Sequence, residues 1–165
     1  MPLARRPLLL VLALAALIAV GGCGSDSEET ASKSTPEASA APEATKPEVT
    51  VPKGKLPKKL EITDLKKGSG ATAEPGKQVS VQYVGVSALN GRQFDASWDR
   101  GEPFQFQLGA GSVIPGWDEG VKGMKVGGRR QLVIPPDLAY GPDGSPPTIG
   151  PNETLVFVID LVSVD

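Results

Sequence analysis

The sequence predicts an α+β domain in which an antiparallel sheet of about five strands packs against one short helix. Several segments alternate apolar and polar residues, the pattern of half-buried strands. Only residues 115–126 repeat apolar side chains at helical spacing. Many of the 20 glycines and 16 prolines stand between these segments, which is typical of a turn-rich β protein. We expect this domain to span residues 59–165.

The first two strands are expected near residues 60–65 and 78–84. The earlier segment alternates at its start and leads into a turn over residues 66–70, which contain two glycines. On the later strand, one face carries the side chains of Val79, Val81 and Tyr83. That face is expected to be buried.

A hairpin is expected at Asn90-Gly91, because this dipeptide suits a two-residue type I′ turn in which both residues have positive φ. The returning strand is then expected to begin near Arg92. A further strand is expected over residues 104–108, where aromatic and amide side chains alternate up to Gly109.

The single helix is expected over residues 115–126. Positions i, i+4 and i+7 share one apolar face, formed by Trp117, Val121 and Met124. Gly120 and Gly123 each cost about 1 kcal/mol relative to Ala, so this helix depends on packing against the rest of the domain. Its expected end is Gly127-Gly128.

Two more strands are expected over residues 130–134 and 154–164. The last one is a nearly continuous apolar run, which indicates burial on both faces or a helix laid across it. Between them, residues 135–152 contain six prolines and three glycines, the composition of an ordered loop of turns. A long loop in a compact domain is often functional.

Two segments are expected to precede the domain. Residues 8–20 form an apolar run that is too short to span a bilayer and follows an arginine pair, so residues 1–22 are predicted to be a lipoprotein signal peptide. Small residues before Cys23 resemble a bacterial lipobox, which predicts an extracytoplasmic protein anchored to the bacterial cell membrane by a lipid on Cys23. Residues 24–58 are rich in Ser, Thr, Ala, Pro, Glu and Lys and are expected to be a disordered linker. The arginine pair leaves both general secretory and twin-arginine export open.

The composition excludes several kinds of chemistry. The chain has no histidine, which excludes Ser-His-Asp and Cys-His nucleophiles, imidazole metal sites and histidine bases. Its one cysteine, Cys23, cannot form an intrachain disulfide or a thiolate zinc cluster. With 17 basic and 19 acidic residues, the net charge of −2 argues against nucleic-acid binding. We expect no metal and no cofactor.

Two apparent motifs have simpler interpretations. Gly109 and Gly111 resemble part of a phosphate-binding loop, yet no Gly-Lys-Ser/Thr follows them. Asp118 and Glu119 are adjacent and do not face each other on a helix, so they suit the positive end of the helix dipole better than a metal site.

The eight aromatic residues all lie in the predicted domain, and core packing is the simplest interpretation of any one of them. Three positions favour a pocket instead. Tyr140 lies in the loop rich in Pro and Gly, Asp95 interrupts an apolar alternation, and Trp117 opens the helix. An apolar pocket with a few polar groups at its rim is typical of a binding site.

Six segments, in order and at family-like spacing, resemble the FKBP-type peptidyl-prolyl isomerase family: residues 81–85, 91–97, 103–106, 113–121, 134–141 and 154–157. The resemblance covers roughly residues 60–165 and implies a twisted antiparallel sheet wrapped around a short helix. Two features depart from the family pattern: Ser145, where many members have His, and Pro147-Thr148. They leave the preferred residue before proline open.

The resemblance implies a catalytic set formed by Tyr83, Phe94, Asp95, Ile114, Trp117, Tyr140 and Phe157, with Phe104, Val113 and Arg100 binding substrate. Trp117 is the implied floor beneath the prolyl ring, with Phe94 and Phe157 beside the amide. The implied donors to substrate carbonyls are Ile114 N–H and Tyr140 O–H. Asp95 is placed at the rim, oriented by Tyr83 and Arg100.

The implied activity is non-covalent isomerisation of X-Pro bonds in exported polypeptides by a monomer. The macrolides tacrolimus and rapamycin are the implied inhibitors. The residues also leave open a binding module that holds proline-containing segments or a hydrophobic ligand with little turnover. A two-lobed solute-binding lipoprotein is a poor fit, because residues 59–165 are too few for two lobes.

Overall fold

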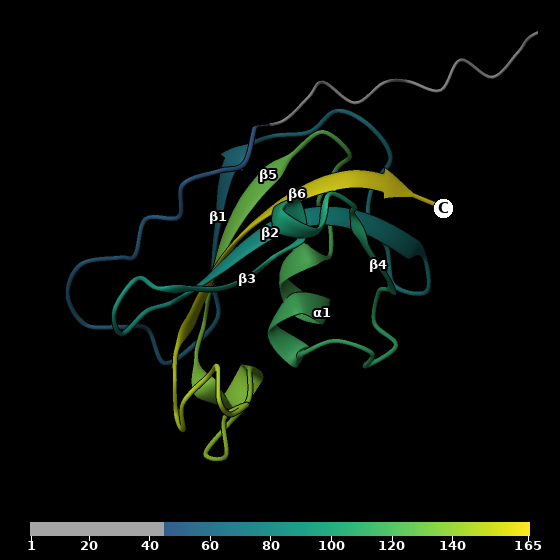
Figure 1. Cartoon of the computed structure of the whole chain (residues 1–165). Helices are drawn as coiled ribbons and strands as arrows, with labels where there is room; N and C mark the ends of the chain where they lie inside the picture. Colours follow the sequence, from purple (N-terminus) through teal and green to yellow (C-terminus); the bar gives the residue numbers. More distant parts are fainter. Residues whose placement is uncertain (1–44) are drawn as a thin grey trace, which may run out of the picture. The chain divides into compact units, whose positions relative to one another are not determined.

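The structure is a computed structural model that describes residues 45–165. Its strands there are β1 (Glu61–Lys66), β2 (Gln78–Ser87), β3 (Gln93–Ala96), β4 (Phe104–Gln107), β5 (Arg129–Ile134) and β6 (Leu155–Val164). The helices are α1 (Pro115–Val121) and two 3-10 helices, η1 (Ser97–Arg100) and η2 (Pro136–Leu138) (Figure 1). The predicted signal peptide, Cys23 and residues 24–44 of the predicted linker lie outside the described residues. No helix in the described part is long and apolar enough to cross a membrane.

The strands form one antiparallel sheet in the order β1-β5-β6-β2-β3, with β4 also paired to β2. β4 pairs with the first half of β2, from Gln78 to Val81, and β3 pairs with the second half, from Val84 to Val86. The two short strands therefore share one edge of the ten-residue β2, with η1 between them. The predicted α+β fold is confirmed, and the sheet has six strands where about five were expected.

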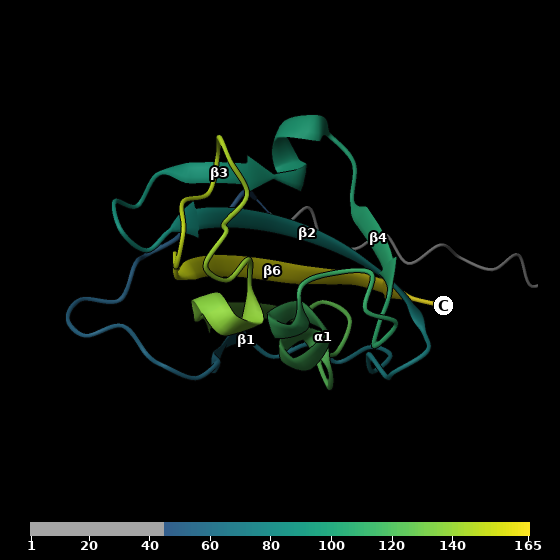
Figure 2. The ribbon, with the colours of Figure 1, turned by 90° about the horizontal axis from the view of Figure 1, so that it is seen from below.

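Each face of the sheet has its own core, because side chains alternate along a strand. The helix α1 lies across one face of the sheet (Figures 1 and 2). The main core fills the space between them, where the strand residues Val79, Val81 and Tyr83 meet Trp117 and Val121. On the opposite face lies an outer core of Val84, Val86, Ala96, Val133 and Val156. The apolar run of β6 is thus explained by burial on both faces, one of the two expected arrangements.

The N-terminal part of the described chain contacts the domain, although it falls within the segment that was predicted to be a disordered linker. Val49 and Val51 are partly buried and pack against the outer core. Two valines placed two positions apart are enough to dock a segment whose average composition is polar. We call residues 45–52 the N-terminal strap.

The helix is shorter than predicted, since α1 ends at Val121. Gly123 adopts a left-handed φ of +78°, and its N–H donates to Ala73 O over 2.9 Å. The chain therefore leaves the helix before Gly127-Gly128. Met124, expected on the helix face, is still buried in the main core.

The turn at Asn90-Gly91 is not the predicted type I′ turn, because only Gly91 has a positive φ, +71°. Ser87 N–H donates to Arg92 O over 2.9 Å and closes a loop over residues 88–91. Asn90 Oδ1 accepts a hydrogen bond from Arg92 N–H over 2.9 Å. This local bond favours the wider loop over the two-residue turn.

Two glycines allow α1 to lie close to β5. A Cβ added to Gly116 would lie 2.4 Å from Ile134 Cγ2, and one added to Gly120 would lie 2.5 Å from Leu132 Cδ1. Both distances are shorter than any normal contact between carbon atoms. The helix can pack here only because these positions carry no side chain.

Candidate functional site

Trp117 is the centre of a cluster of aromatic rings beneath the sheet. Its ring centroid lies 4.9 Å from that of Tyr83, 5.3 Å from Phe157, 5.6 Å from Phe106 and 6.0 Å from Phe104. The Trp117 side chain is 4% exposed, and its Nε1–H has no hydrogen-bond partner among the described residues. Together with Phe94, these residues form what we call the aromatic site. Its rings come from β2, β3, β4, α1 and β6.

Phe94 and Phe157 meet edge to face, with ring centroids 5.5 Å apart. Both rings lie over Gly85 of β2, where an added Cβ would be 2.7 Å from Phe94 Cζ and 2.7 Å from Phe157 Cε1. Gly85 therefore leaves the space that the two rings occupy. Sequence reasoning included Gly85 in a family segment but assigned it no role.

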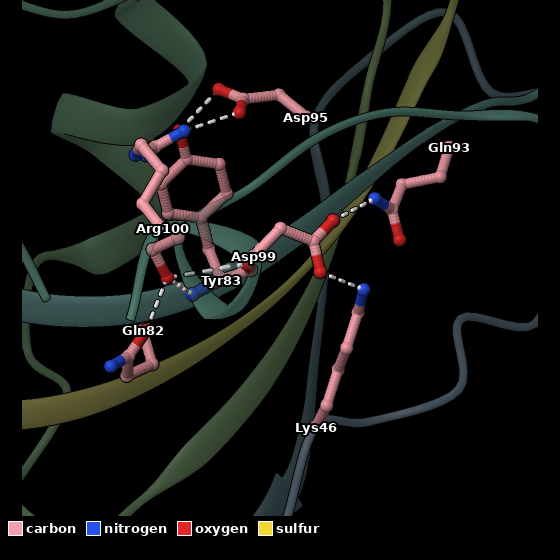
Figure 3. A network of polar contacts seen from close by, with 8 residues as sticks. Lys46, Gln82, Tyr83, Gln93, Asp95, Asp99 and Arg100 are labelled. Carbon is pink, nitrogen blue, oxygen red and sulfur yellow. Dashed lines mark hydrogen bonds and ion pairs between the residues drawn. The ribbon is translucent and has the colours of Figure 1, made fainter. Parts of the chain in front are cut away.

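A polar network lies beside the rings, formed by Tyr83, Asp95 and Arg100 (Figure 3). Tyr83 O–H donates to Asp95 Oδ2, and Arg100 Nη1 donates to Asp95 Oδ1 over 2.5 Å. Arg100 Nη2 also donates to Tyr83 Oη over 2.9 Å. The structure thus brings Asp95 into contact with Tyr83 and Arg100, the two residues that the resemblance implied would orient it.

Burial and the hydrogen bond to Asp95 raise the pKa of Tyr83 to about 12. The hydrogen bonds to Tyr83 and Asp95 raise the pKa of Arg100 above its usual range. The phenol therefore stays protonated and the guanidinium stays charged at neutral pH. Neither of these two groups therefore titrates near pH 7, and the network serves to orient its members.

η1 is fixed to β2 by the fully buried Ser97. Its hydroxyl accepts a hydrogen bond from Tyr83 N–H over 2.8 Å and donates to Gln82 Oε1. These bonds hold the start of η1 against β2. They therefore determine the position of Arg100, the last residue of this helix.

Val113 and Ile114 precede α1 and pack against the main core beside the rings. Ile114 N–H donates no hydrogen bond within residues 45–165, so it is available to an acceptor on a ligand. Asp118 holds the preceding loop, because its carboxylate accepts hydrogen bonds from Gly109 N–H (2.8 Å) and Gly111 N–H (3.0 Å). These contacts give Asp118 a structural role that its place at the helix start did not predict.

Tyr140 lies in the loop between β5 and β6 and is 41% exposed. Its hydroxyl makes no hydrogen bond to another described residue. Partial burial and the negative charge of Asp95 raise the pKa of Tyr140 above its usual value. Phe104 is similarly exposed, at 37%, while its ring stacks on Phe106 with a centroid distance of 5.8 Å.

The sequence reasoning missed Phe106 as part of the site. Phe106 is 4% exposed, and its ring contacts both Phe104 and Trp117, so it supports both. Alternation along β4 was the available signal, because Phe104 and Phe106 lie on the same face of that strand. Cys23, the predicted lipidation site, lies outside the described residues.

A separate hollow of about 260 Å³ contains no aromatic side chain and is lined by charged residues that include Lys66, Lys125 and Arg130. Arg130 already has hydrogen-bond acceptors within the protein, because it donates to Asp64 Oδ1 (2.6 Å) and Gly120 O (2.8 Å). Within residues 45–165, no group of His, Cys, Asp and Glu is arranged to hold a metal ion. The aromatic site therefore offers the best candidate for function: an apolar surface with free hydrogen-bond donors beside it.

The chain is similar in sequence to proteins of one known family. A family model described as FKBP-type peptidyl-prolyl cis-trans isomerase matches residues 69–162. An FK506-binding protein of Streptomyces anulatus is 59% identical over 112 residues, which are 67% of this chain and 90% of that protein. A probable FK506-binding protein of Corynebacterium glutamicum is 54% identical over 110 residues, which are 67% of this chain and 91% of that protein.

Two solved structures are similar as well. The crystal structure of AtFKBP13 has a TM-score of 0.60 and 38% identity, covering 64% of this chain and 93% of that chain. FkpA from Escherichia coli has a TM-score of 0.59 and 45% identity, covering 64% of this chain and 48% of that chain.

Proposed function

This chain belongs to the FKBP-type peptidyl-prolyl cis-trans isomerase family, and we propose that it isomerises X-Pro bonds of exported proteins at the aromatic site. The observation that carries the proposal is the buried Trp117 ring with four other rings around it. A prolyl ring is flat-sided and apolar, and it fits against such a surface.

An X-Pro bond isomerises through a twisted amide that has lost its resonance, behind a barrier of about 18–20 kcal/mol. The planar amide is more polar and better hydrated than the twisted one. An apolar site that excludes water therefore disfavours the planar ground state relative to the transition state, which is the condition for catalysis. Lowering the barrier by about 5 kcal/mol corresponds to a rate increase of a few thousandfold.

The polar groups hold the flanking chain while the amide turns. Ile114 N–H and Tyr140 O–H, which lack partners within residues 45–165, are proposed to donate to substrate carbonyls. Asp95, held by Tyr83 and Arg100, is proposed to orient the substrate at the edge of the site. No proton transfer is required in this scheme.

Exchange NMR on a short peptide with an apolar residue before proline tests the proposal without a coupling protease. We expect the purified protein to accelerate cis-trans exchange, and we expect tacrolimus or rapamycin at saturation to abolish the acceleration. Macrolide binding without acceleration of exchange would instead support the binding-module hypothesis. Full activity at macrolide saturation would show that the aromatic site is not the site of isomerisation.

The rate is expected to change little with pH. Because the pKa of Tyr83 is raised to about 12 and that of Tyr140 is raised as well, both phenols keep their proton through neutral pH. The stabilisation linked to the raised pKa of Tyr83 is complete below the ordinary tyrosine value of about 10 and is lost only as the pH rises toward 12. We expect kcat/KM to vary less than about threefold between pH 6 and 8.5. A bell-shaped profile centred near pH 7 would contradict this mechanism.

We propose that the protein is exported and anchored by a lipid on Cys23. The support is the apolar run of residues 8–20, which ends in small residues before the cysteine. Cys23→Ala is expected to move the protein from the membrane fraction to the soluble fraction, since two acyl chains give stable attachment. An unchanged membrane fraction, with no lipid mass on the wild-type N-terminal peptide, would refute the anchor.

A further inference from the structure

The N-terminal strap makes a polar contact with η1, the short helix that ends in Arg100. Lys46 Nζ lies 2.5 Å from Asp99 Oδ1, and Gln93 Nε2 donates to Asp99 Oδ2 over 2.7 Å (Figure 3). Asp99 is therefore held between the strap on one side and the first residue of β3 on the other. The hydrogen bonds to Lys46 and Gln93 lower the pKa of Asp99, so its carboxylate stays ionised at neutral pH.

The strap also has an apolar contact with the same region. Val49 and Val51 pack against the outer core, and Trp98 of η1 packs against that core as well. Thr45 O accepts a hydrogen bond from Arg129 Nη2 over 3.0 Å, which fixes the start of the strap on β5. Lys46 and Asp99 are both exposed, and an exposed ion pair contributes little alone. The two valines must therefore supply most of the attachment.

η1 connects these contacts to the aromatic site. Trp98 and Asp99 immediately precede Arg100, which donates hydrogen bonds to both Asp95 and Tyr83. A displacement of this four-residue helix moves the guanidinium that orients Asp95. The strap lies outside residues 69–162, the part of the chain that matches the family model.

We infer that the N-terminal strap is a positioning segment for the isomerase site: it holds η1 so that Arg100 keeps Asp95 and Tyr83 in place. The inference rests on the proposed function of the aromatic site. The strap itself touches no substrate in this scheme and acts through Arg100.

The decisive variant is Val49→Ser/Val51→Ser in the full chain, which removes the apolar attachment. Its matched control is Glu48→Ser/Thr50→Ser, which changes the exposed neighbours in the same strap. We expect the valine variant to lower kcat/KM by about three- to tenfold. A misplacement of about 1 Å can cost about a hundredfold, and the strap acts on the site only through Arg100, so a smaller loss is expected. The control is expected to retain the wild-type rate. Lys46→Ala is expected to have a smaller effect in the same direction, with Lys46→Arg restoring the rate.

A double-mutant cycle shows whether the strap acts through Arg100. In an Arg100→Ala background, the valine variant is expected to cause no further loss of kcat/KM. The same fold-loss in both backgrounds would overturn the inference, as would a valine variant with unchanged kcat/KM.

NMR provides a readout that does not depend on activity. The sequence has 2 tryptophans, so the indole signals of Trp98 and Trp117 report separately on η1 and on the aromatic site. The valine variant is expected to shift the Trp98 indole and Arg100 guanidinium signals, while the Trp117 indole signal and the signals of the main core stay in place. A shifted Trp98 signal with an unmoved Arg100 signal would overturn the inference. If the wild-type protein shows no isomerisation, the proposed function fails, and the Arg100 signal still decides whether the strap positions this residue.

Discussion

Phe94→Ala is expected to lower kcat/KM for X-Pro isomerisation by more than about tenfold. The Phe94 ring packs edge to face on Phe157 with its centroid 5.5 Å away, and it closes the aromatic site on the side of β3. Its loss admits water beside the reacting amide, which restores hydration of the planar ground state. Because Phe94 is only partly buried, the domain is expected to stay folded.

Exchange NMR on a proline peptide measures this effect, and circular dichroism checks the fold. Leu89→Ala is the matched control, because this side chain is 82% exposed at the loop after β2 and lies outside the aromatic site. Asp95→Ala is expected to reduce the rate less than Phe94→Ala, since Asp95 acts from the edge. A Phe94→Ala protein that is folded and fully active would rule out water exclusion as the source of catalysis.

Gly120→Ala is expected to destabilise the domain, although helix propensity alone predicts the reverse. Alanine in place of glycine favours a helix by about 1 kcal/mol. At this position, however, the new Cβ would lie 2.5 and 2.7 Å from the two Cδ atoms of Leu132, which is fully buried in the main core. Overpacking of this kind costs about 1–3 kcal/mol, so we expect a net loss in the free energy of unfolding. The shift of α1 should also displace Trp117 and lower activity.

Chemical denaturation measures the change in the free energy of unfolding. Leu132→Ala supplies the control, because it removes the atoms that the new methyl group would meet. The double variant Gly120→Ala/Leu132→Ala is expected to be more stable than the sum of the two single losses predicts. A gain of about 1 kcal/mol in the Gly120→Ala single variant would show that propensity outweighs packing here.

The strands could be predicted from sequence because their signal is local. Val79, Val81 and Tyr83 alternate with polar residues, and the structure buries all three on one face of β2. The signal that ends α1, by contrast, comes from a residue far away in the sequence. Gly123 takes its left-handed conformation where its N–H donates to Ala73 O, fifty residues earlier, so the predicted end at Gly127-Gly128 was wrong.

The strap shows a second limit of sequence reasoning. The average composition of residues 24–58 predicts disorder. Val49 and Val51 are too few to change that average, yet they pack against the outer core. That surface is assembled from β2, β3, β5 and β6, so nothing near the valines in the sequence indicates it.

The candidate site was reached mainly through the family resemblance. The residues themselves suggested only an apolar pocket near Trp117, Asp95 and Tyr140. The contacts that complete the site join residues far apart in the chain, such as Gly85 beneath Phe157. Nothing in a single sequence identifies a glycine whose role is to leave room for neighbouring side chains.

The strap begins on the face of the sheet opposite the aromatic site. Thr45 is bonded to Arg129, whose side chain lies on the outer-core face of the sheet together with Val133, while Trp117 lies beneath the opposite face. If a lipid on Cys23 anchors the chain, as proposed, the connection to it reaches the described domain at Thr45, on the face of the sheet opposite the aromatic site. A polypeptide bound at the aromatic site would then lie on the side of the sheet away from this connection.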